Sequence, residues 1–465
     1  MSDAKPGKAY LSAVQDQYEV YPYPERDPES EKQRLHYTWG DNLAQINHYC
    51  CRGKNAFAGP TRVLVAGGGT GDATIFLAVQ LRDTGSKIVY LDFSRSSLEI
   101  ARKRAEIRGL DNITWIHGSL LDLPALNLGK FDYINCSGVL HHLQDPVGGL
   151  QALQSVLAPD GAIRIMIYGR YGRTGVYQVQ DLMRIINRNE PSMQGRLANA
   201  KAMLACLPPT NWWTKSKGLF QQVKSMGDAE VYDFFLHAQD RSYTVPELYD
   251  WVEKTCKMHI QLSRMKVGRS AYLPESYIKD SPLLQMVKEL PLFEQQAIAE
   301  LIAGDIDRHS FYATASDDTA ASIAELDNVP FFFLDFESVK GRDLSEYMDR
   351  NPGKHPQFKN ANTGASFELV SGKYSRHLLR HLDGDRSLRE IFQLARNDEP
   401  LRSTAVTDAQ LLEDFRPVFE LFNGAEGMLL RHKSVRRFPG IRNLQSTRRV
   451  DSQSAALGQR NGGNA

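Results

Sequence analysis

The sequence predicts an α/β protein with a mainly parallel, doubly wound sheet, followed by a smaller α+β domain. Between about residues 29 and 167, apolar runs of strand length alternate with helical patterns, as expected for strands covered on both faces. The run at 62–66 breaks into clustered glycines, and the run at 87–92 ends in an aspartate. The chain of 465 residues is too long for one typical core, so two or three units are expected.

The glycine cluster predicts a nucleotide-binding turn between the first strand and the first helix. Gly67, Gly69 and Gly71 lack Cβ atoms where the backbone must approach a ligand, and the amides that open the next helix offer unpaired donors. Thr70 stands inside the turn. Asp92 ends the second strand, where its carboxylate can accept hydrogen bonds from both hydroxyls of a ribose.

The spacing of the glycines separates two classes of ligand. A dinucleotide fold requires Gly-x-Gly-x-x-Gly, whereas this chain has Gly67-x-Gly69-x-Gly71, which disfavours an NAD-dependent oxidoreductase. The pattern resembles motif I of the class I S-adenosylmethionine (SAM) methyltransferases. Further blocks resemble, in order, the adenine loop, the fourth strand with its loop, and the helix and fifth strand of that family: 112–124, 131–146 and 150–168. The resemblance implies a Rossmann-like methyltransferase domain with SAM as its cofactor.

The resemblance also implies which residues bind SAM. Ser119 with the Leu120 amide is the first choice for the adenine edge, and Asp122 is the second. Val65 departs from the family, because an acidic residue commonly stands there and helps to hold the methionine amino group. Another group must take that role. The expected cofactor residues are Gly67, Gly69, Thr70, Gly71, Asp92, Phe93, Ser119, Leu120, Asp122 and Ser137.

His141, His142 and Tyr171 are the candidate catalytic residues. The histidines follow the fourth strand, where methyltransferases often place groups near the methyl donor. Methyl transfer is an in-line displacement, so a base is needed only if the nucleophile arrives protonated; a structural role for one histidine is the alternative. The Asn/Asp-Pro-Pro-Tyr signature of many nitrogen methyltransferases is replaced by Asn135-Cys-Ser-Gly138, so the acceptor atom stays open.

Two segments outside the strand pattern are expected to contact the substrate. Tyr21 and Tyr23 belong to a proline-interrupted aromatic arm that predicts a lid, with a surface strap as the alternative. Arg170, Arg173 and Tyr177 follow the fifth strand and predict a site for a carboxylate or phosphate. The alternative is a glycine-shaped turn whose arginines point to water.

The expected organisation has five parts, with an insertion in the second. An aromatic N-terminal arm precedes the methyltransferase domain, which a helical cap interrupts after the fifth strand. A helical linker, a winged-helix-like accessory domain and a disordered tail follow. Their predicted bounds are 1–28 for the arm, 29–278 for the methyltransferase domain with its cap at about 170–242, 279–328 for the linker, 329–440 for the accessory domain and 441–465 for the tail.

Composition and charge disfavour several classes of function, with nucleic acid kept as a minor alternative partner. The net charge of +1 gives no electrostatic reason to expect nucleic acid as a partner, and no apolar stretch is long enough to cross a bilayer. The N-terminus lacks a signal-peptide core, and the five cysteines form no CxxC pair, so a cytoplasmic protein with reduced thiols is expected. His377 and His381 lie four apart without further ligands, so they are interpreted as helix-surface residues and no metal site is predicted.

The leading hypothesis is a cytoplasmic SAM-dependent methyltransferase whose unidentified acceptor includes protein or peptide side chains. One alternative keeps the enzyme and gives it a small-molecule acceptor. A second alternative, raised by Val65, is a SAM-binding regulatory protein without turnover. The sequence predicts neither the acceptor atom nor the oligomeric state.

Overall fold

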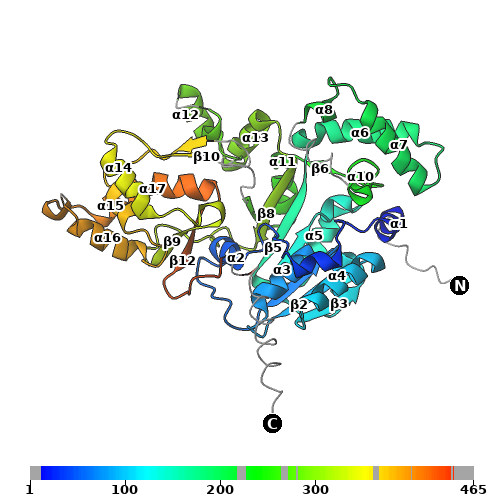
Figure 1. Ribbon diagram of the computed structural model, residues 1–465, viewed down its shortest axis with the longest axis horizontal. Helices are drawn as coiled ribbons and strands as arrows, with labels where there is room; N and C mark the ends of the chain where they lie inside the picture. Colours follow the sequence, from blue (N-terminus) through cyan, green and yellow to red (C-terminus); the bar gives the residue numbers. More distant parts are fainter. Residues whose placement is uncertain are drawn as a thin grey trace, which may run out of the picture. The chain divides into compact units, whose positions relative to one another are not determined.

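The computed structural model describes residues 12–216, 227–262, 271–278, 281–359, 366–399, 401–440 and 444 (Figure 1). The chain forms two compact units. Unit 1 comprises Met1–Thr38, Gly59–Leu262 and Tyr277–Ala315. Unit 2 comprises Trp39–Ala58, Ser263–Ser276 and Ser316–Ala465. In the described part of the chain, no helix combines the length and the apolar character needed to span a membrane.

Unit 1 is built on an eight-stranded sheet with the order β3-β2-β1-β4-β5-β8-β7, in which the short β6 also pairs with β5. Strands β1 to β6 pair in parallel, whereas β8 is antiparallel to both β5 and β7. The predicted mainly parallel, Rossmann-like sheet is therefore confirmed. The strands are β1 (Arg62–Ala66), β2 (Lys87–Asp92), β3 (Ile113–His117), β4 (Phe131–Ser137), β5 (Leu157–Gly169), β6 (Ser242–Tyr243), β7 (His259–Leu262) and β8 (Arg308–Thr314).

The apolar runs of the sequence become the covered strands of this sheet. In β1, the residues from Val63 to Ala66 are at most 1% exposed, and Leu64 and Ala66 contribute to a core shared with β4, β5 and β8. Side chains fix where the helices begin: Ser94 accepts a hydrogen bond from the Ser97 amide, and Asp145 does the same for Gly148. The helices between the strands are α3 (Asp72–Leu81), α4 (Arg95–Ile107) and α5 (Pro146–Ser155).

The segment that follows β5 is helical, as expected for the insertion at 170–242. Val179, Trp213 and Phe235 form a small core among these helices, separate from the core of the sheet. In Figure 1 the helices gather at one end of unit 1, away from β2 and β3, and α1 (Ser12–Val20) lies between them and α4. They are α6 (Thr174–Ile186), α7 (Met193–Cys206), α8 (Trp212–Lys215) and α10 (Asp228–Phe235).

The structure departs from the expected helical linker at 279–328. This segment does contain α12 (Pro282–Lys288) and α13 (Leu292–Ala303), but β8 follows them and pairs with β5. Phe311, Tyr312 and Ala313 of β8 are fully buried. The strand begins with Arg-His-Ser, and this polar start obscured its apolar half in the sequence.

Unit 2 is a smaller α+β unit that also takes in residues expected in the methyltransferase domain. Helix α2 (Leu43–Cys50) belongs to it, and the His48 side chain accepts a hydrogen bond from the Leu430 amide. The expected helix, glycine turn and helix at 377–392 appear as α15 (Ser375–Arg380) and α16 (Leu388–Asn397), with Ser387 capping α16. Except for Leu444, the expected tail at 441–465 lies outside the described residues.

The remaining elements of unit 2 form two short antiparallel sheets and the helices around them. Strands β9 (Asn328–Phe332) and β12 (Met428–His432) pair with each other, as do β10 (Gln357–Lys359) and β11 (Ser366–Glu368). The helices are α14 (Gly341–Arg350), α15 (Ser375–Arg380), α16 (Leu388–Asn397) and α17 (Asp408–Gly424).

Candidate functional site

The glycine turn after β1 requires glycine at each of its three motif positions. Gly67, Gly69 and Gly71 have φ angles of +75°, +50° and +104°, which other residues rarely adopt. A Cβ atom on Gly67 would lie 2.3 Å from a methyl group of Val139, and one on Gly69 would lie 2.7 Å from the carbonyl oxygen of Tyr23. The turn is therefore packed between the β4 loop and the N-terminal arm.

Asp92 holds the other side of this turn. Its side chain ends β2, and the residue is 6% exposed. One carboxylate oxygen accepts a hydrogen bond from the Gly69 amide at 2.7 Å, and the other accepts from the Ser94 amide at 2.8 Å. Burial raises the pKa of Asp92 to about 6, and these hydrogen bonds oppose that effect. Each oxygen retains a further lone pair, which suits it to a sugar hydroxyl.

The expected adenine loop forms a 3-10 helix at Leu120–Ala125. Ser119 caps this helix by accepting a hydrogen bond from the Leu121 amide at 3.2 Å, so its hydroxyl proton remains to donate. Ser119 and Leu120 are buried, whereas Asp122 is exposed. Phe93, after β2, and Ser137, at the end of β4, are half-buried.

The N-terminal arm lies across the glycine turn. The carbonyl oxygens of Tyr23 and Pro24 accept hydrogen bonds from the Thr70 amide at 3.4 Å and from its hydroxyl at 2.7 Å. Farther along the arm, the Glu19 carboxylate accepts from the amides of Arg95 and Ser96 at the start of α4. The arm thus covers the turn at which the sequence predicts SAM.

A buried ion-pair network anchors the arm behind the turn. Arg104 is fully buried and lies 2.6 Å from Glu31, 2.7 Å from Asp72 and 2.7 Å from the Thr70 carbonyl oxygen. Arg26 of the arm also binds Asp72, at 2.7 Å. Burial alone would raise the pKa of Asp72, but Arg26 and Arg104 hold it below its usual value.

A second group of polar side chains, the histidine cluster, is buried beyond β4 and β5. It consists of the half-buried Tyr18 and the buried His141, His142, Tyr168, Asp233 and His237. The hydroxyls of Tyr18 and Tyr168 donate to the two carboxylate oxygens of Asp233, at 2.9 and 3.3 Å. The Tyr18 oxygen also lies 3.2 Å from Nε2 of His237. Residues from the arm, from the ends of β4 and β5, and from the insertion therefore meet here.

The two predicted catalytic histidines both belong to the cluster, in different settings. Nδ1 of His142 lies 2.8 Å from the Gln239 carbonyl oxygen, and its ring stacks on His237 with the centroids 3.7 Å apart. His141 is fully buried, and neither of its ring nitrogens has a hydrogen-bond partner among the described residues. Burial, with His142 and Arg173 nearby, holds the pKa of His141 well below its usual value, so this ring is neutral.

The structure does not favour the predicted anion site at Arg173. The residue is 2% exposed, its guanidinium lies 3.3 Å from Asp240, and its Cζ stands 3.5 Å from the centre of the Tyr168 ring. Tyr177 donates to the same carboxylate at 3.3 Å. The positive charge expected to bind a substrate anion therefore already faces an internal carboxylate.

The other predicted substrate and catalytic residues lie apart from these contacts. Arg170 is exposed and pairs with Glu247 at 2.7 Å. Tyr21 stacks on Tyr232 of α10, with the centroids 4.8 Å apart. Tyr171 is half-buried, and its carbonyl oxygen accepts a hydrogen bond from the Thr174 hydroxyl. None of these contacts brings Tyr171 to the histidine cluster.

Sequence reasoning missed Asp233 and His237. Both lie in the insertion, where no sequence motif marks functional residues. The only sequence feature that could have indicated a buried polar site is the single aspartate within the apolar run Val231-Tyr-Asp-Phe-Phe235. Together with His142 they offer ligand atoms within 4.8 Å of one another, the one such group found among the described residues. The prediction of surface positions for both His377 and His381 was wrong, because His377 is 3% exposed and packs beside Asp398.

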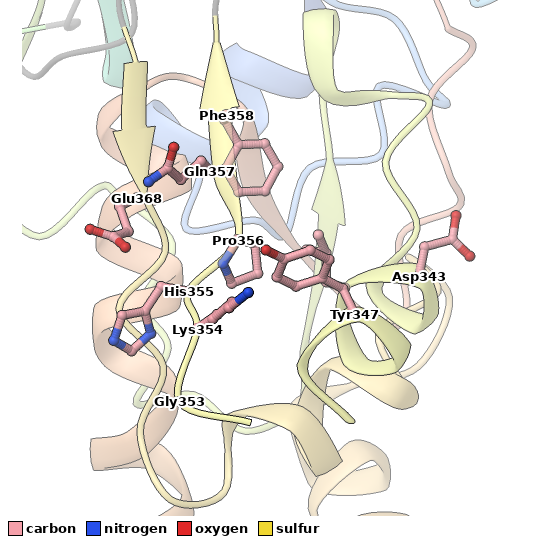
Figure 2. Close-up of a pocket in the computed structure, with 10 residues that line it drawn as sticks. Asp343, Tyr347, Gly353, Lys354, His355, Pro356, Gln357, Phe358 and Glu368 are labelled. Atoms are coloured by element: carbon pink, nitrogen blue, oxygen red, sulfur yellow. The ribbon is translucent and has the colours of Figure 1, made fainter. Parts of the chain in front are cut away.

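Unit 2 contains a cavity of its own, of about 610 Å³. Figure 2 shows the rings of Tyr347 and Phe358 and the side chain of Lys354 turned toward this space. None of the predicted site residues lines it. The lining residues are Asp343, Leu344, Tyr347, Gly353, Lys354, His355, Pro356, Gln357, Phe358 and Glu368.

Comparison with known proteins identifies the domain that carries the glycine turn. Residues 64–163 match the model of a methyltransferase domain family. The chain contains a class I SAM-dependent methyltransferase domain. Its fold is also that of PKMT2 from Rickettsia typhi, solved in complex with AdoHcy, with a TM-score of 0.57 and 15% identity over 85% of this chain and 76% of that one.

Three relatives by sequence show how far the likeness extends. An uncharacterized protein of Synechococcus sp. is 28% identical over 303 residues, which cover 64% of this chain and 70% of that protein. The tRNA 5-carboxymethoxyuridine methyltransferase of Escherichia coli is 34% identical over 112 residues, 24% of this chain and 41% of the enzyme. The ubiquinone biosynthesis O-methyltransferase of Vibrio campbellii is 26% identical over 163 residues, 34% and 65% of the two chains. The chain thus spans less than half of the tRNA enzyme.

Proposed function

We propose that the protein transfers a methyl group from SAM to the side chain of a protein or peptide in the cytoplasm. The observation that carries this proposal is the hydrogen bond from the Gly69 amide to the Asp92 carboxylate. It joins the end of β2 to the glycine turn of a methyltransferase domain. SAM, when bound, supplies an electrophilic methyl group on a sulfonium. The chain then has to hold the donor, admit the acceptor in line and exclude water.

The residues around the turn suit this task. The amides that open α3 and the carboxylate of Asp92 offer donors and acceptors to a nucleoside. The arm, held to the turn through Thr70 and to α4 through Glu19, shields the bound donor from water. The insertion after β5 stands at the carboxyl end of the sheet, where ligands of open α/β folds bind, and supplies the walls for an acceptor.

The choice of a protein or peptide acceptor rests on the extent of the fold likeness to PKMT2, which covers 85% of this chain and so extends well beyond the common methyltransferase domain at 64–163. A small-molecule acceptor is the first alternative. The tRNA methyltransferase among the relatives removes the argument against nucleic acid that was drawn from net charge, so RNA is the second. A SAM-binding regulator without turnover is the third, because Val65 replaces the family's usual acidic residue.

The cofactor half of the proposal is tested by calorimetric titration of the purified chain with S-adenosylhomocysteine. We expect micromolar binding that weakens at least about a hundredfold in Asp92→Ala, because the ribose loses its charged acceptor. Asp83→Ala, which removes an exposed carboxylate from the turn before β2, is the matched control and should bind like the parent chain. Absence of binding to the folded parent chain would contradict the proposal.

The acceptor half is tested with methyl-labelled SAM and cell lysate separated into protein, RNA and small-molecule fractions. Label in the protein fraction that depends on Asp92 supports the proposal. Label in the RNA or small-molecule fraction would replace the acceptor, and binding of the cofactor without label in any fraction would favour the regulatory alternative.

A further inference from the structure

In the described part of the chain, the histidine cluster and its neighbours contain two buried carboxylates, Asp233 and Asp240, but only one buried arginine or lysine, Arg173. The side chains of Asp240 and Arg173 are almost fully buried and pair with each other at 3.3 Å. Asp233 is 1% exposed, and its hydrogen bonds come from two tyrosine hydroxyls. Among the described residues, no lysine or arginine forms an ion pair with it. A buried carboxylate without a cation is costly, so a positively charged ligand would be stabilised here.

Two of the three histidines, His141 and His237, do not supply the missing charge. Burial holds the pKa values of His141 and His237 well below the usual value, so both rings are neutral. Burial also raises the pKa of Asp233, an effect that His142 and the Tyr18 hydroxyl oppose. The environment thus disfavours the isolated carboxylate anion and favours a partner that carries a positive charge and hydrogen-bond donors.

The histidine cluster also contains hydrogen-bond acceptor nitrogens to which no donor of the described residues is bonded. In neutral His142, the Nδ1–H donates to the Gln239 carbonyl, which leaves a lone pair on Nε2. Each neutral imidazole has one acceptor nitrogen, and that of His141 has no donor among the described residues. A carboxylate and two imidazole acceptors suit a group with three N–H donors and one positive charge.

We propose that the histidine cluster binds a primary ammonium group. This inference rests on the proposed function and has two possible sources for the ammonium. One is the methionine end of SAM, whose usual acidic partner is replaced by Val65. The other is an amine of the methyl acceptor. The cluster includes His141 and His142 after β4, and Val139 of the same loop packs against Gly67, so it adjoins the turn predicted to hold the donor.

A metal ion is the competing ligand for His142, Asp233 and His237, and hydrogen bonding disfavours it. The Gln239 amide donates to Nδ1 of His237 at 3.0 Å, so the neutral ring carries its proton on Nε2. Nε2 faces the Tyr18 hydroxyl at 3.2 Å. A metal would need a lone pair on this nitrogen, and ligating histidines normally donate through their other nitrogen rather than accept there.

If the ammonium belongs to the acceptor, the cluster also prepares it for reaction. One proton passes from the ammonium to the Asp233 carboxylate, which leaves a neutral amine with a lone pair. That lone pair forms the N–C bond to the methyl group while the C–S bond breaks and its electrons remain on sulfur. The methylated nitrogen keeps the positive charge. If the ammonium belongs to SAM, no proton is transferred.

The test compares Asp233→Asn, which removes the charge and keeps the shape, with Asp228→Asn, which changes an exposed carboxylate on the same helix α10. Both variants are titrated with S-adenosylhomocysteine and with an analogue that lacks its amino group. If SAM supplies the ammonium, Asp233→Asn weakens binding of S-adenosylhomocysteine at least tenfold and leaves binding of the analogue unchanged.

If the acceptor supplies the ammonium, S-adenosylhomocysteine binds both variants equally. Labelling of the protein fraction then falls at least a hundredfold in Asp233→Asn, and prior acetylation of the amines in that fraction abolishes labelling by the parent chain. The inference is overturned if Asp233→Asn changes neither binding nor labelling, or if the parent chain binds one equivalent of Zn²⁺ that Asp233→Asn loses. Cofactor binding by the parent chain separates these results from failure of the proposed function.

A second variant guards against failure of Asp233→Asn to fold. His141→Phe keeps an aromatic ring and removes both nitrogens. We expect it to weaken the same quantity at least fivefold, either binding of S-adenosylhomocysteine but not of its analogue, or amine labelling. No change in either quantity would exclude His141 from the site and, with Asp233→Asn unfolded, would overturn the inference.

Discussion

Two buried histidines, one in each unit, differ in the hydrogen-bond partners of their ring nitrogens. His48 of unit 2 is 2% exposed, its Nδ1 accepts a hydrogen bond from the Leu430 amide at 3.1 Å, and its Nε2 lies 3.1 Å from the Asn423 side chain. His141 of unit 1 is 0% exposed, and neither nitrogen has a partner among the described residues. Both rings are buried, but only His48 accepts a hydrogen bond from another part of the described chain.

The pKa values of His48 and His141 do not distinguish the two rings. Burial lowers the pKa of His48 to about 4 and also holds that of His141 well below its usual value. Both rings are therefore neutral at physiological pH, and their hydrogen-bond partners alone tell them apart. An unpaired buried polar group costs stability, so its presence calls for an explanation such as a ligand.

The largest expected effect is on stability when His48 is removed. His48→Ala leaves a cavity and an unpaired amide at Leu430, and should lower the free energy of unfolding of unit 2 by about 4 kcal/mol. Hydrogen exchange of α2 and β12 in the full chain reports this change. His432→Ala, at the end of β12, is the control and should change it by less than about 1 kcal/mol. Equal effects of the two variants would remove the structural role assigned to His48.

Acid should weaken unit 2 by a somewhat smaller amount. The folded pKa of His48, about 4, lies below the unfolded value of 6.5, so the unfolded chain takes up the proton first. The contribution of His48 is complete above pH 6.5 and declines by about 3 kcal/mol as the pH falls to 4. The same exchange measurement at pH 7 and pH 4.5, made on the parent chain and on His48→Gln, isolates this term. A parent chain with the same pH dependence as the variant would contradict it.

The smallest effect is expected where the ring has no partners. His141→Phe removes no hydrogen bond and conserves most of the side-chain volume. The free energy of unfolding of unit 1 should therefore change by less than about 1 kcal/mol, and a change in either direction agrees with this prediction. Urea unfolding of the full chain, with exchange of β4 and β5 as the local probe, measures it. A loss above about 2 kcal/mol would show that His141, like His48, has a structural role.

The features that could be predicted from the sequence are those that depend on residues close to one another along the chain. The glycines and Asp92 follow apolar runs of strand length, so their meeting at one edge of a parallel sheet was foreseeable. Asp233 and His237 were missed because only the packing of α10 against the arm and the strand ends brings them to His142. Arg173 was found, but its partner Asp240 lies 67 positions away, and no local pattern could pair them.

The ion pairs of Arg104 couple the glycine turn to the segment of chain that precedes the first strand. Arg104 contacts both the Thr70 carbonyl oxygen, on the back of the glycine turn, and Glu31, just after the arm, so the turn and this segment share one buried guanidinium. Proteolytic removal of the chain up to Glu31 would leave that charge unpaired on one side and release the turn. The affinity for the methyl donor would then report whether the N-terminal segment had been clipped, although Arg104 itself stands behind the turn rather than on its ligand side.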